Sequence, residues 1–448
     1  MTQISDTRIL LTGQTLSFDG DPRLDEGALR FTEKGAVLIE AGDIVWSGQF
    51  GEEPKDITSG AVRHDYGDDL ILPGFIDGHA HYPQTGVIAS FGTQLLEWLE
   101  KYTFPEESLF SDLNYAREKA SLFLDLLLSN GTTTAAVYCT VHRESAEAFF
   151  EEATSRNLRM IAGKVLMDRN APLTVMDTAL SGYEDTKSLI EKWHGRGRNL
   201  YAVTPRFAPT STPEQLEACG ALISEFDDVY LQTHVAENLD EIKWVADLFP
   251  NAASYQDVYA HYKMIGPRSL YGHAIHMDDA DLAMAAETQT KFVHCPTSNL
   301  FMGSGLFDLN RVWKAGIDVM LGCDVGGGTS LSPFATMKAA YEIAQQAGFS
   351  LTPEVAFWLS TAGGAETLSL GDKIGRLEPG YEADIVVLNL KSTPIIQQRV
   401  ERAESLRDIL FAQMILADDR AIRAVYTSGN RIKAKQKITN GRDREQAR

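Results

Sequence analysis

The chain has 448 residues, 44% of them hydrophobic, and carries a formal net charge of −21 at pH 7. This length exceeds one typical domain and the apolar content is ample for a large core, so we expect one large domain with a smaller one beside it. The acidity argues against nucleic acids and anionic membranes as partners, because both repel a negative surface, and it favours a neutral or cationic small substrate.

The cysteines and the hydropathy of the chain predict a cytoplasmic protein. The four cysteines lie mostly within apolar runs and show no Cys-x-x-Cys spacing, as expected for reduced thiols in the cytosol. The N-terminus has no basic segment followed by a continuous apolar one, and no run approaches the ~18 apolar residues that a membrane helix needs. We therefore expect no membrane partner.

Both ends of the chain carry short strand-like runs. In residues 1–72 these runs alternate with glycines and acidic residues, which predicts hairpins. Turn-and-strand patterns return near the other end, on either side of a mostly helical insertion at 391–424. We expect 1–72 and 374–448 to pair into one small β-sandwich domain, with a frayed polar tail from Lys433 onward.

The central part of the chain, 73–373, alternates strands with helices. Eight β-rich runs, each followed by a stretch of helical periodicity, predict an α/β fold of the (β/α)8 TIM-like barrel type. In such barrels the reactive groups lie at the carboxyl ends of the strands. The predicted strands are 70–79, 132–138, 159–166, 201–207, 230–234, 269–273, 291–295 and 318–324.

A His-x-His pair ends the first run, in the sequence PGFIDGHAH at 73–81. Alternate residues of a strand project from one face, so His79 and His81 point the same way and can share a metal ion. The pair alone is a weak signal, and further ligands are sought at the ends of other strands, where His234 and Asp324 stand. Three histidines and an aspartate suit Zn²⁺, while Fe²⁺ and Mn²⁺ are compatible with the same ligand types.

Glu237, three residues after His234, is a candidate proton carrier. The chain leaves the strand there, so this carboxylate can turn back over a metal-bound water, whose proton Asp324 can accept. Structural alternatives exist: Asp324 as a helix N-cap, Glu237 as a solvated acid in a first helical turn, and His273 as a hydrogen-bonded core residue. The glycines at 326–328 lack the Lys-Ser/Thr of a phosphate-binding loop, so we interpret them as a close backbone approach beside Asp324.

The fourth strand predicts one metal ion rather than two. Some barrel hydrolases bridge two metals with a lysine near the end of the fourth strand, whereas this chain has Arg206-Phe207 at that place. Lys164, in the third strand, is interpreted as a salt-bridge residue. The planar donors of Arg206 beside an aromatic ring suit a flat, acceptor-rich heterocycle. The amide of Gln84 can both donate and accept hydrogen bonds, which matches the edge of a lactam or amidine ring. The alternative is that Gln84 is simply a polar residue of a surface loop.

These motifs resemble the amidohydrolase superfamily and, within it, the branch that deaminates guanine. The likeness runs through most of the chain and includes one segment, 95–105, that is typical of this branch alone. The matching segments are PGFIDGHAHYPQ at 73–84, LLEWLEKYTFP at 95–105, TPRFAPT at 204–210, HVAEN at 234–238, HCPTSNL at 294–300 and GCDVGGGT at 322–329.

The resemblance implies a barrel with an appended β domain, one zinc ion, and hydrolysis of guanine to xanthine and ammonia in purine catabolism, by a homodimer. It implies Glu237 as the proton shuttle and His273 as a polar group that, together with Asp324, orients and deprotonates the attacking water. The implied metal ligands are His79, His81, His234 and Asp324. The implied purine contacts are Gln84, Arg206 and Phe207, together with the ligands His81, His234 and Asp324.

Two departures from the family pattern affect expected affinity and rate rather than reaction type. Gly78 and Ala80 replace larger residues, and Cys323 replaces a usual threonine.

Two alternative functions are less consistent with the motifs. An aminohydrolase for a pterin, triazine or oxidised purine would keep the metal set but lose the TPRF and LLEWL signatures, and an inactive scaffold would have lost a ligand or the glutamate.

Overall fold

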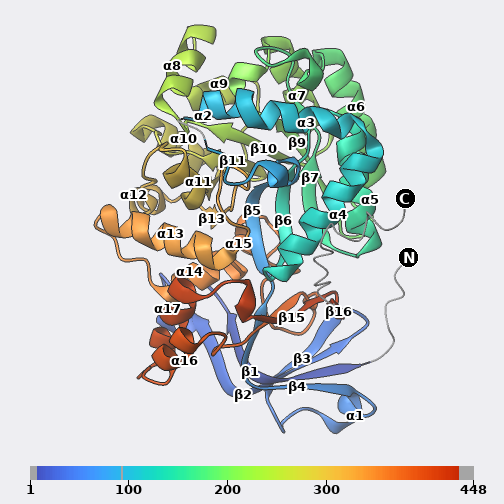
Figure 1. The fold of residues 1–448 in the computed structure, drawn as a ribbon, viewed down its shortest axis with the longest axis vertical. Helices are drawn as coiled ribbons and strands as arrows, with labels where there is room; N and C mark the ends of the chain where they lie inside the picture. The colour runs from blue at the N-terminus through green and yellow to red at the C-terminus, as the bar shows by residue number, and fades with distance from the viewer. Residues whose placement is uncertain (1–7, 92–93, 433–448) are drawn as a thin grey trace, which may run out of the picture.

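The computed structural model describes residues 8–91 and 94–432, and the tail predicted to fray from Lys433 lies outside them. Its larger sheet has the strand order β13-β12-β11-β10-β9-β7-β6-β5 and forms the predicted parallel barrel (Figure 1). These strands are β5 (Phe75–His81), β6 (Thr132–Tyr138), β7 (Arg159–Gly163), β9 (Leu200–Pro205), β10 (Tyr230–Val235), β11 (Ser269–His273), β12 (Lys291–His294) and β13 (Val319–Leu321), with the short β8 (Val165–Leu166) paired to β9.

The barrel closes where its first and last strands meet. The backbone N–H of Asp324 donates to the carbonyl of His79 over 2.7 Å, and the N–H of His81 donates to the carbonyl of Val325 over 3.1 Å. These hydrogen bonds lie at the carboxyl end of β5 and just beyond β13. Closure therefore sets the His-x-His pair directly against the aspartate that follows the last strand.

The barrel interior is filled with side chains. One buried apolar residue from each of the main strands joins a single cluster, which residues of α15 (Ala362–Thr367) and of the segment after it complete. The strand residues are Ile76, Ala136, Ile161, Ala202, Tyr230, Leu270, Val293 and Met320. The barrel is thus a packed core, and its polar chemistry is left to the carboxyl ends of the strands.

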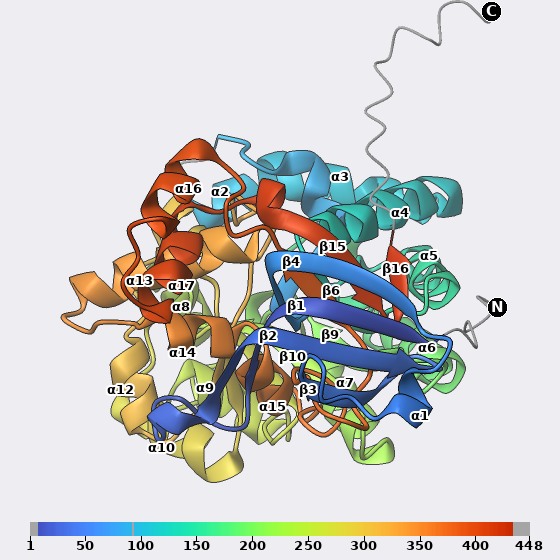
Figure 2. The same ribbon diagram turned by 90° about the horizontal axis from the view of Figure 1, so that it is seen from below.

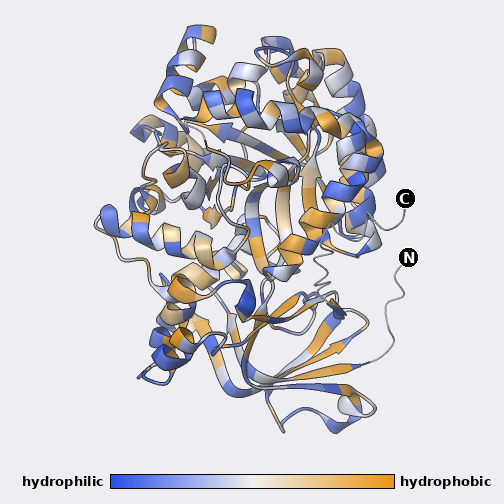
Figure 3. Ribbon diagram, in the orientation of Figure 1, coloured by the Kyte–Doolittle hydropathy of each residue, from blue (hydrophilic) through white to orange (hydrophobic). Residues whose placement is uncertain are grey.

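Helices surround the barrel and carry both hydrophilic and hydrophobic residues (Figure 3), as expected for elements with one face on a core. Most of them connect consecutive strands, as the alternation in the sequence predicts. They are α2 (Leu95–Trp98), α3 (Phe104–Glu107), α4 (Leu113–Ser129), α5 (Arg143–Ser155), α6 (Ala179–Trp193), α7 (Pro213–Glu225), α8 (Leu239–Leu248), α9 (Tyr255–His261), α10 (Asp279–Thr288), α11 (Pro296–Phe301), α12 (Leu309–Lys314), α13 (Pro333–Gln346) and α14 (Pro353–Leu359).

Both chain ends form a second, seven-stranded sheet below the barrel, best seen in Figure 2. Its order is β16-β15-β14-β4-β1-β2-β3, and all neighbours are antiparallel except β1 and β4. This confirms the expected β domain built from both ends. Its elements are β1 (Ile9–Phe18), β2 (Leu29–Glu40), β3 (Asp43–Gln49), α1 (Lys55–Thr58), β4 (Val62–Pro73), β14 (Ile385–Leu388), β15 (Ile422–Thr427) and β16 (Asn430–Ile432), with α16 (Pro394–Val400) and α17 (Leu406–Leu416) in the predicted helical insertion.

The first predicted barrel strand, 70–79, is divided between the two sheets. Residues 70–73 end β4 of the small sheet, and the barrel strand begins at Phe75. Gly74 marks the change, since its N–H donates to the carbonyl of Asp384 and a Cβ on it would lie 2.1 Å from Thr133 Oγ1. The sequence conceals this change because the residues on both sides of Gly74 are buried and apolar.

Across residues 8–91 and 94–432, the helices are all too short or too polar to cross a bilayer. The four cysteines, Cys139, Cys219, Cys295 and Cys323, are buried and free. Their state agrees with the expectation of reduced thiols.

Candidate active site

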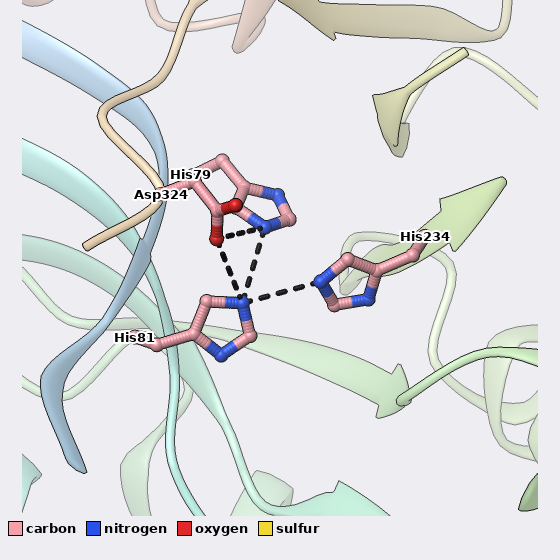
Figure 4. Close-up of side chains that lie close together, drawn as sticks. All are labelled: His79, His81, His234 and Asp324. Atoms are coloured by element: carbon pink, nitrogen blue, oxygen red, sulfur yellow. Dashed lines mark hydrogen bonds and ion pairs between the residues drawn. The ribbon is translucent and has the colours of Figure 1, made fainter. Parts of the chain in front are cut away.

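The candidate metal ligands converge at the carboxyl end of the barrel strands. His79 and His81 belong to β5, His234 to β10, and Asp324 follows β13, and their donor atoms all lie within 4.8 Å of one another (Figure 4). His81 Nε2 is 3.2 Å from Nε2 of both His79 and His234. Both β5 histidines have Nε2 3.3 Å from Asp324 Oδ1. The four residues selected from sequence therefore form one compact cluster.

The donor chemistry of this cluster fits a divalent cation. His234 Nδ1 lies 2.6 Å from the carbonyl oxygen of Arg206, which only accepts, so Nδ1 carries the proton and Nε2 presents its lone pair to the cluster. Converging lone pairs and a carboxylate repel one another unless a cation lies between them. Imidazole and carboxylate are common ligands of divalent metal ions in proteins.

Burial and charge keep the histidines neutral and the aspartate ionised. Burial lowers the pKa of His81 to about 3. Burial and the neighbouring histidines hold the pKa of His234 well below its ordinary value. For Asp324, burial alone would raise the pKa, but the adjacent His79 and His81 outweigh burial and hold that pKa well below its usual range. Deprotonated side chains of this kind are what metal binding requires.

Two titratable side chains stand beside the cluster. His273, at the end of β11, has Nε2 3.4 Å from Glu237 Oε2 and 3.7 Å from Asp324 Oδ2. Burial raises the pKa of Glu237. Burial by itself would lower the pKa of His273, but the carboxylates of Glu237 and Asp324 raise it overall. Both shifts are upward, so Glu237 and His273 hold a proton more readily than the free side chains do, which suits groups that transfer protons.

Two of these residues have an unusual backbone conformation. Asp324 has a φ of 48° and His273 a φ of 68°, both in the left-handed region. Residues with a Cβ enter this region rarely, at a cost on the order of 1–3 kcal/mol each, and they concentrate at functional sites. The surrounding fold therefore stabilises a strained arrangement that points both side chains into one site.

Further polar side chains hold His273 and Glu237 in place, and the sequence analysis missed them. Asn299 Oδ1, in α11, lies 2.8 Å from His273 Nδ1, and Ser304 Oγ donates to Glu237 Oε1 over 3.0 Å. Glu241 accepts hydrogen bonds of 3.0 Å from the backbone N–H groups of Glu237 and its neighbour. Asn299 lies inside the HCPTSNL motif, which is the only signal that could have identified it, and Ser304 has none.

The structural alternatives considered from the sequence do not hold for three site residues. Glu237 is only 3% exposed and precedes Asn238, the N-cap of α8. The helix that follows Asp324, α13, has Ser332 as its N-cap. Gln84 is 2% exposed and lies in a 3-10 segment, Tyr82–Val87. These side chains are therefore neither a helix cap nor solvated surface groups.

A pocket opens onto the cluster. The residues predicted to hold a substrate, Gln84, Arg206 and Phe207, line it together with His81, His234, Glu237, His273 and Asp324. Leu95 and Trp98 of α2 and Leu99, in the π-helical turn that follows, also line it. The segment typical of the guanine-deaminating branch thus contributes to the cavity wall.

The glycines after Asp324 approach the backbone closely, as predicted. A Cβ on Gly326 would lie 2.6 Å from the carbonyl oxygen of Gln84, and one on Gly328 would lie 1.8 Å from that of Cys323. Backbone atoms cannot rotate away as a flexible side chain does. Glycine is therefore required here for the loop that carries Asp324 to pack against the cavity wall.

We expect the substitution Gly328→Ala to weaken metal binding at least about tenfold, the lower end of what disturbing the support of a ligand costs. The new Cβ would displace the backbone of Cys323 and, with it, the adjacent Asp324. Titration of metal-free protein with zinc measures the change. Gly20→Ala is the matched control, because the nearest atom to its Cβ would be 3.9 Å away; equal affinities for the two variants would contradict the prediction.

The two departures from the family pattern are accommodated by their neighbours. A Cβ on Gly78 would lie 2.7 Å from Met320 Sδ, so the side chain of the last strand fills the space that a larger residue would take. Asp77 Oδ1 accepts hydrogen bonds from the backbone N–H groups of His79 and Cys323, at 3.1 and 3.0 Å. Burial raises the pKa of Asp77 to about 6, and the nearby Cys323 thiol opposes that rise.

Two further polar residues at or near the barrel strands, Lys164 and His294, have structural partners. Lys164 forms a buried ion pair with Asp177, as predicted for a salt-bridge residue. His294 stacks on Phe307, with 4.6 Å between the ring centroids, and it is not part of the four-residue cluster.

The fold and the site together define a metal-dependent barrel hydrolase. The family model described as Amidohydrolase family matches residues 70–432. The chain belongs to the amidohydrolase family.

Relatives within this family share most of the chain. The guanine deaminase of Escherichia coli is 46% identical over 412 residues, which cover 92% of this chain and 94% of that protein. The solved structure of E. coli guanine deaminase has a TM-score of 0.92 at 44% identity, covering 95% of this chain and 99% of that one. Guanine deaminase from C. acetobutylicum, solved with guanine in its active site, has a TM-score of 0.86 at 28% identity, covering 95% and 100%.

Proposed function

We propose that this protein hydrolyses guanine to xanthine and ammonia, using one divalent metal ion. The proposal rests on one pocket that brings together three kinds of group. They are the cluster of three histidines and one aspartate, the buried Glu237, and a wall formed by Gln84 and Arg206. The similarity to guanine deaminases over more than nine tenths of the chain supports the choice of substrate. The proposed ligands are His79, His81, His234 and Asp324.

The chain's own side chains account for the proton transfers. When bound, a divalent ion would lower the pKa of a coordinated water from about 15.7 to about 7 and so supply a nucleophile at neutral pH. Asp324 and His273 orient the attacking water and accept its proton. Glu237 gives a proton to the ring nitrogen next to C2 of guanine. The proton taken from the water then passes through Glu237 to the amino group, so that the C2–N bond breaks and ammonia leaves. The hydroxyl on C2 returns its proton to Glu237 as it becomes the carbonyl of xanthine.

Specificity comes from the polar wall of the cavity. Arg206 and Gln84 hydrogen-bond the purine, and Phe207 covers its face. Adenine lacks the oxo group and the adjacent N–H of guanine, so it would leave buried donors and acceptors of this wall unpaired. Mismatches of that kind can discriminate between substrates by large factors.

Finer properties follow from the same chemistry. We propose zinc as the ion, because imidazole and carboxylate groups are among its usual protein ligands and it can hold a water as a fifth ligand. We propose that the barrel domain begins at Phe75, where its first strand starts, rather than at 73, and that it ends at 373. We also propose that the protein acts in purine catabolism in the cytoplasm, which its free buried cysteines support. We also propose that the protein is a homodimer, as its resemblance to the guanine-deaminating branch implies.

The test is the loss of guanine absorbance together with ammonia release by zinc-loaded protein. The controls are 8-oxoguanine, adenine, cytosine, pterin and melamine. We expect guanine-selective turnover that chelation abolishes. Turnover of a control compound instead of guanine would keep the metal mechanism and overturn the roles of Gln84, Arg206 and Phe207, and inactivity toward all compounds would favour a scaffold.

A further inference from the structure

Behind the substrate wall lies a carboxylate that contacts both of its polar residues. Glu107, the last residue of α3, is 1% exposed and is not among the residues that line the cavity. Its Oε1 accepts hydrogen bonds of 3.0 Å from Gln84 Nε2 and from Arg206 Nη1, and its Oε2 accepts one of 2.9 Å from the same Arg206 nitrogen. One buried side chain thus connects two residues that are distant in the sequence.

A carboxylate fixes the orientation of both partners because it can only accept hydrogen bonds. Gln84 must therefore turn its NH₂ group toward Glu107. Its Oε1 then points away from Glu107 and accepts a hydrogen bond of 3.4 Å from the backbone N–H of Gly326. Arg206 donates from Nη1 to both oxygens of Glu107, and among the described residues its Nε and Nη2 have no hydrogen-bond acceptor. The donors and acceptor left for a ligand are therefore set by Glu107.

Glu107 also sets the charge of the wall. Arg206 is 3% exposed, and within the described part of the chain Glu107 is its only ion-pair partner. The ring of Phe104, one turn earlier in the same helical segment, lies 5.5 Å from the guanidinium carbon. A buried guanidinium without a countercharge would attract anions strongly, whereas the Arg206–Glu107 pair is neutral overall.

We propose that Glu107 is a positioning residue that fixes the hydrogen-bonding groups of Gln84 and Arg206 and makes the cavity selective for neutral oxopurines over anionic ones. This inference rests on the proposed function, since it concerns the site assigned to guanine. It predicts opposite effects on two kinds of ligand when the carboxylate is removed. A purely structural ion pair would weaken binding of both kinds alike.

The test compares hypoxanthine, a neutral oxopurine without the reacting amino group, with the urate anion, by equilibrium binding to the full-length zinc-loaded protein. For Glu107→Gln we expect hypoxanthine to bind more weakly and the urate-to-hypoxanthine affinity ratio to rise at least about tenfold. The matched control is Glu106→Gln, which removes the charge of the neighbouring carboxylate. Oε1 of Glu106 accepts a hydrogen bond of 2.7 Å from the hydroxyl of Tyr115 and none from Arg206 or Gln84. This control should leave the ratio unchanged.

Two further variants keep the test decisive. Glu107→Asp retains the charge, so it should keep the wild-type ratio even if both affinities fall. Should the glutamine variant fail to fold, a raised ratio in Glu107→Asp would still contradict the role of the charge. In the double variant Glu107→Gln, Arg206→Gln the unpaired guanidinium is gone, and the preference for urate should disappear. Equal changes for both ligands in Glu107→Gln, or a raised ratio in Glu107→Asp, would overturn the proposal.

Failure of the proposed function would give a different result. Wild-type protein that binds hypoxanthine selectively but does not turn over guanine would contradict the deaminase assignment and leave the effect of Glu107 measurable. Wild-type protein that deaminates guanine, with an unchanged ratio in Glu107→Gln, would contradict the role of Glu107 alone.

Discussion

Replacement of Glu237 with glutamine is expected to lower kcat for guanine by about 10²–10⁴-fold, the usual contribution of a general acid–base group. The amide keeps the size of the carboxylate and still accepts the hydrogen bond from Ser304, but it cannot carry a proton between the water and the purine. Burial raises the pKa of Glu237, which suits a group that must both take up and release a proton near neutral pH. The bound metal should be retained, because Glu237 lies outside the ligand cluster.

The measurement combines steady-state kinetics with the metal content of the same protein samples. Ser304→Ala is the graded comparison, since it removes one hydrogen bond to Glu237 and should cost at most about tenfold in kcat. A Glu237→Gln protein that keeps more than about a tenth of wild-type kcat would take this residue out of the proton transfer. A variant that loses its metal would instead show that Glu237 supports the ligands.

The ligand cluster could be predicted from sequence because the barrel makes strand order and strand ends informative. His79, His81 and His234 lie on strands, and Asp324 directly follows one, so a correct list of strands places all four on the same rim. Alternation along β5 then brings the two β5 histidines to one face, where their Nε2 atoms lie 3.2 Å apart. Errors of a few residues in the strand ends did not matter for this result.

Contacts made by helices were harder to predict. Glu106 and Glu107 are adjacent acids in the same segment, and the sequence does not indicate which one reaches Arg206. The π-helical turn Leu99–Thr103 adds a residue to the turn before them, which shifts the helical phase by about 100° from a regular 3.6-residue period. Only the three-dimensional structure shows that Glu107 faces the substrate wall while Glu106 faces Tyr115.

Replacement of His81 with alanine is expected to abolish both metal binding and turnover. His81 Nε2 lies within 3.3 Å of donor atoms of the three other proposed ligands, so its loss removes the central member of the set. Losing a residue that only supports a ligand already costs about 10–100-fold in metal affinity, and losing a ligand should cost more. Metal analysis after purification and titration with zinc both measure the effect.

Thermal unfolding separates this prediction from general damage to the fold. A metal that binds only the folded state adds about 4.1 kcal/mol of stability when its free concentration is a thousand times its Kd. Zinc should therefore raise the melting temperature of wild-type protein strongly. The His81→Ala protein should show no such rise, whereas His142→Ala, outside the ligand cluster, should keep it. Because the metal-free cluster gathers converging lone pairs and a carboxylate, removal of one imidazole should cost the metal-free protein little stability. A zinc-dependent rise of wild-type size in His81→Ala would place the ion elsewhere.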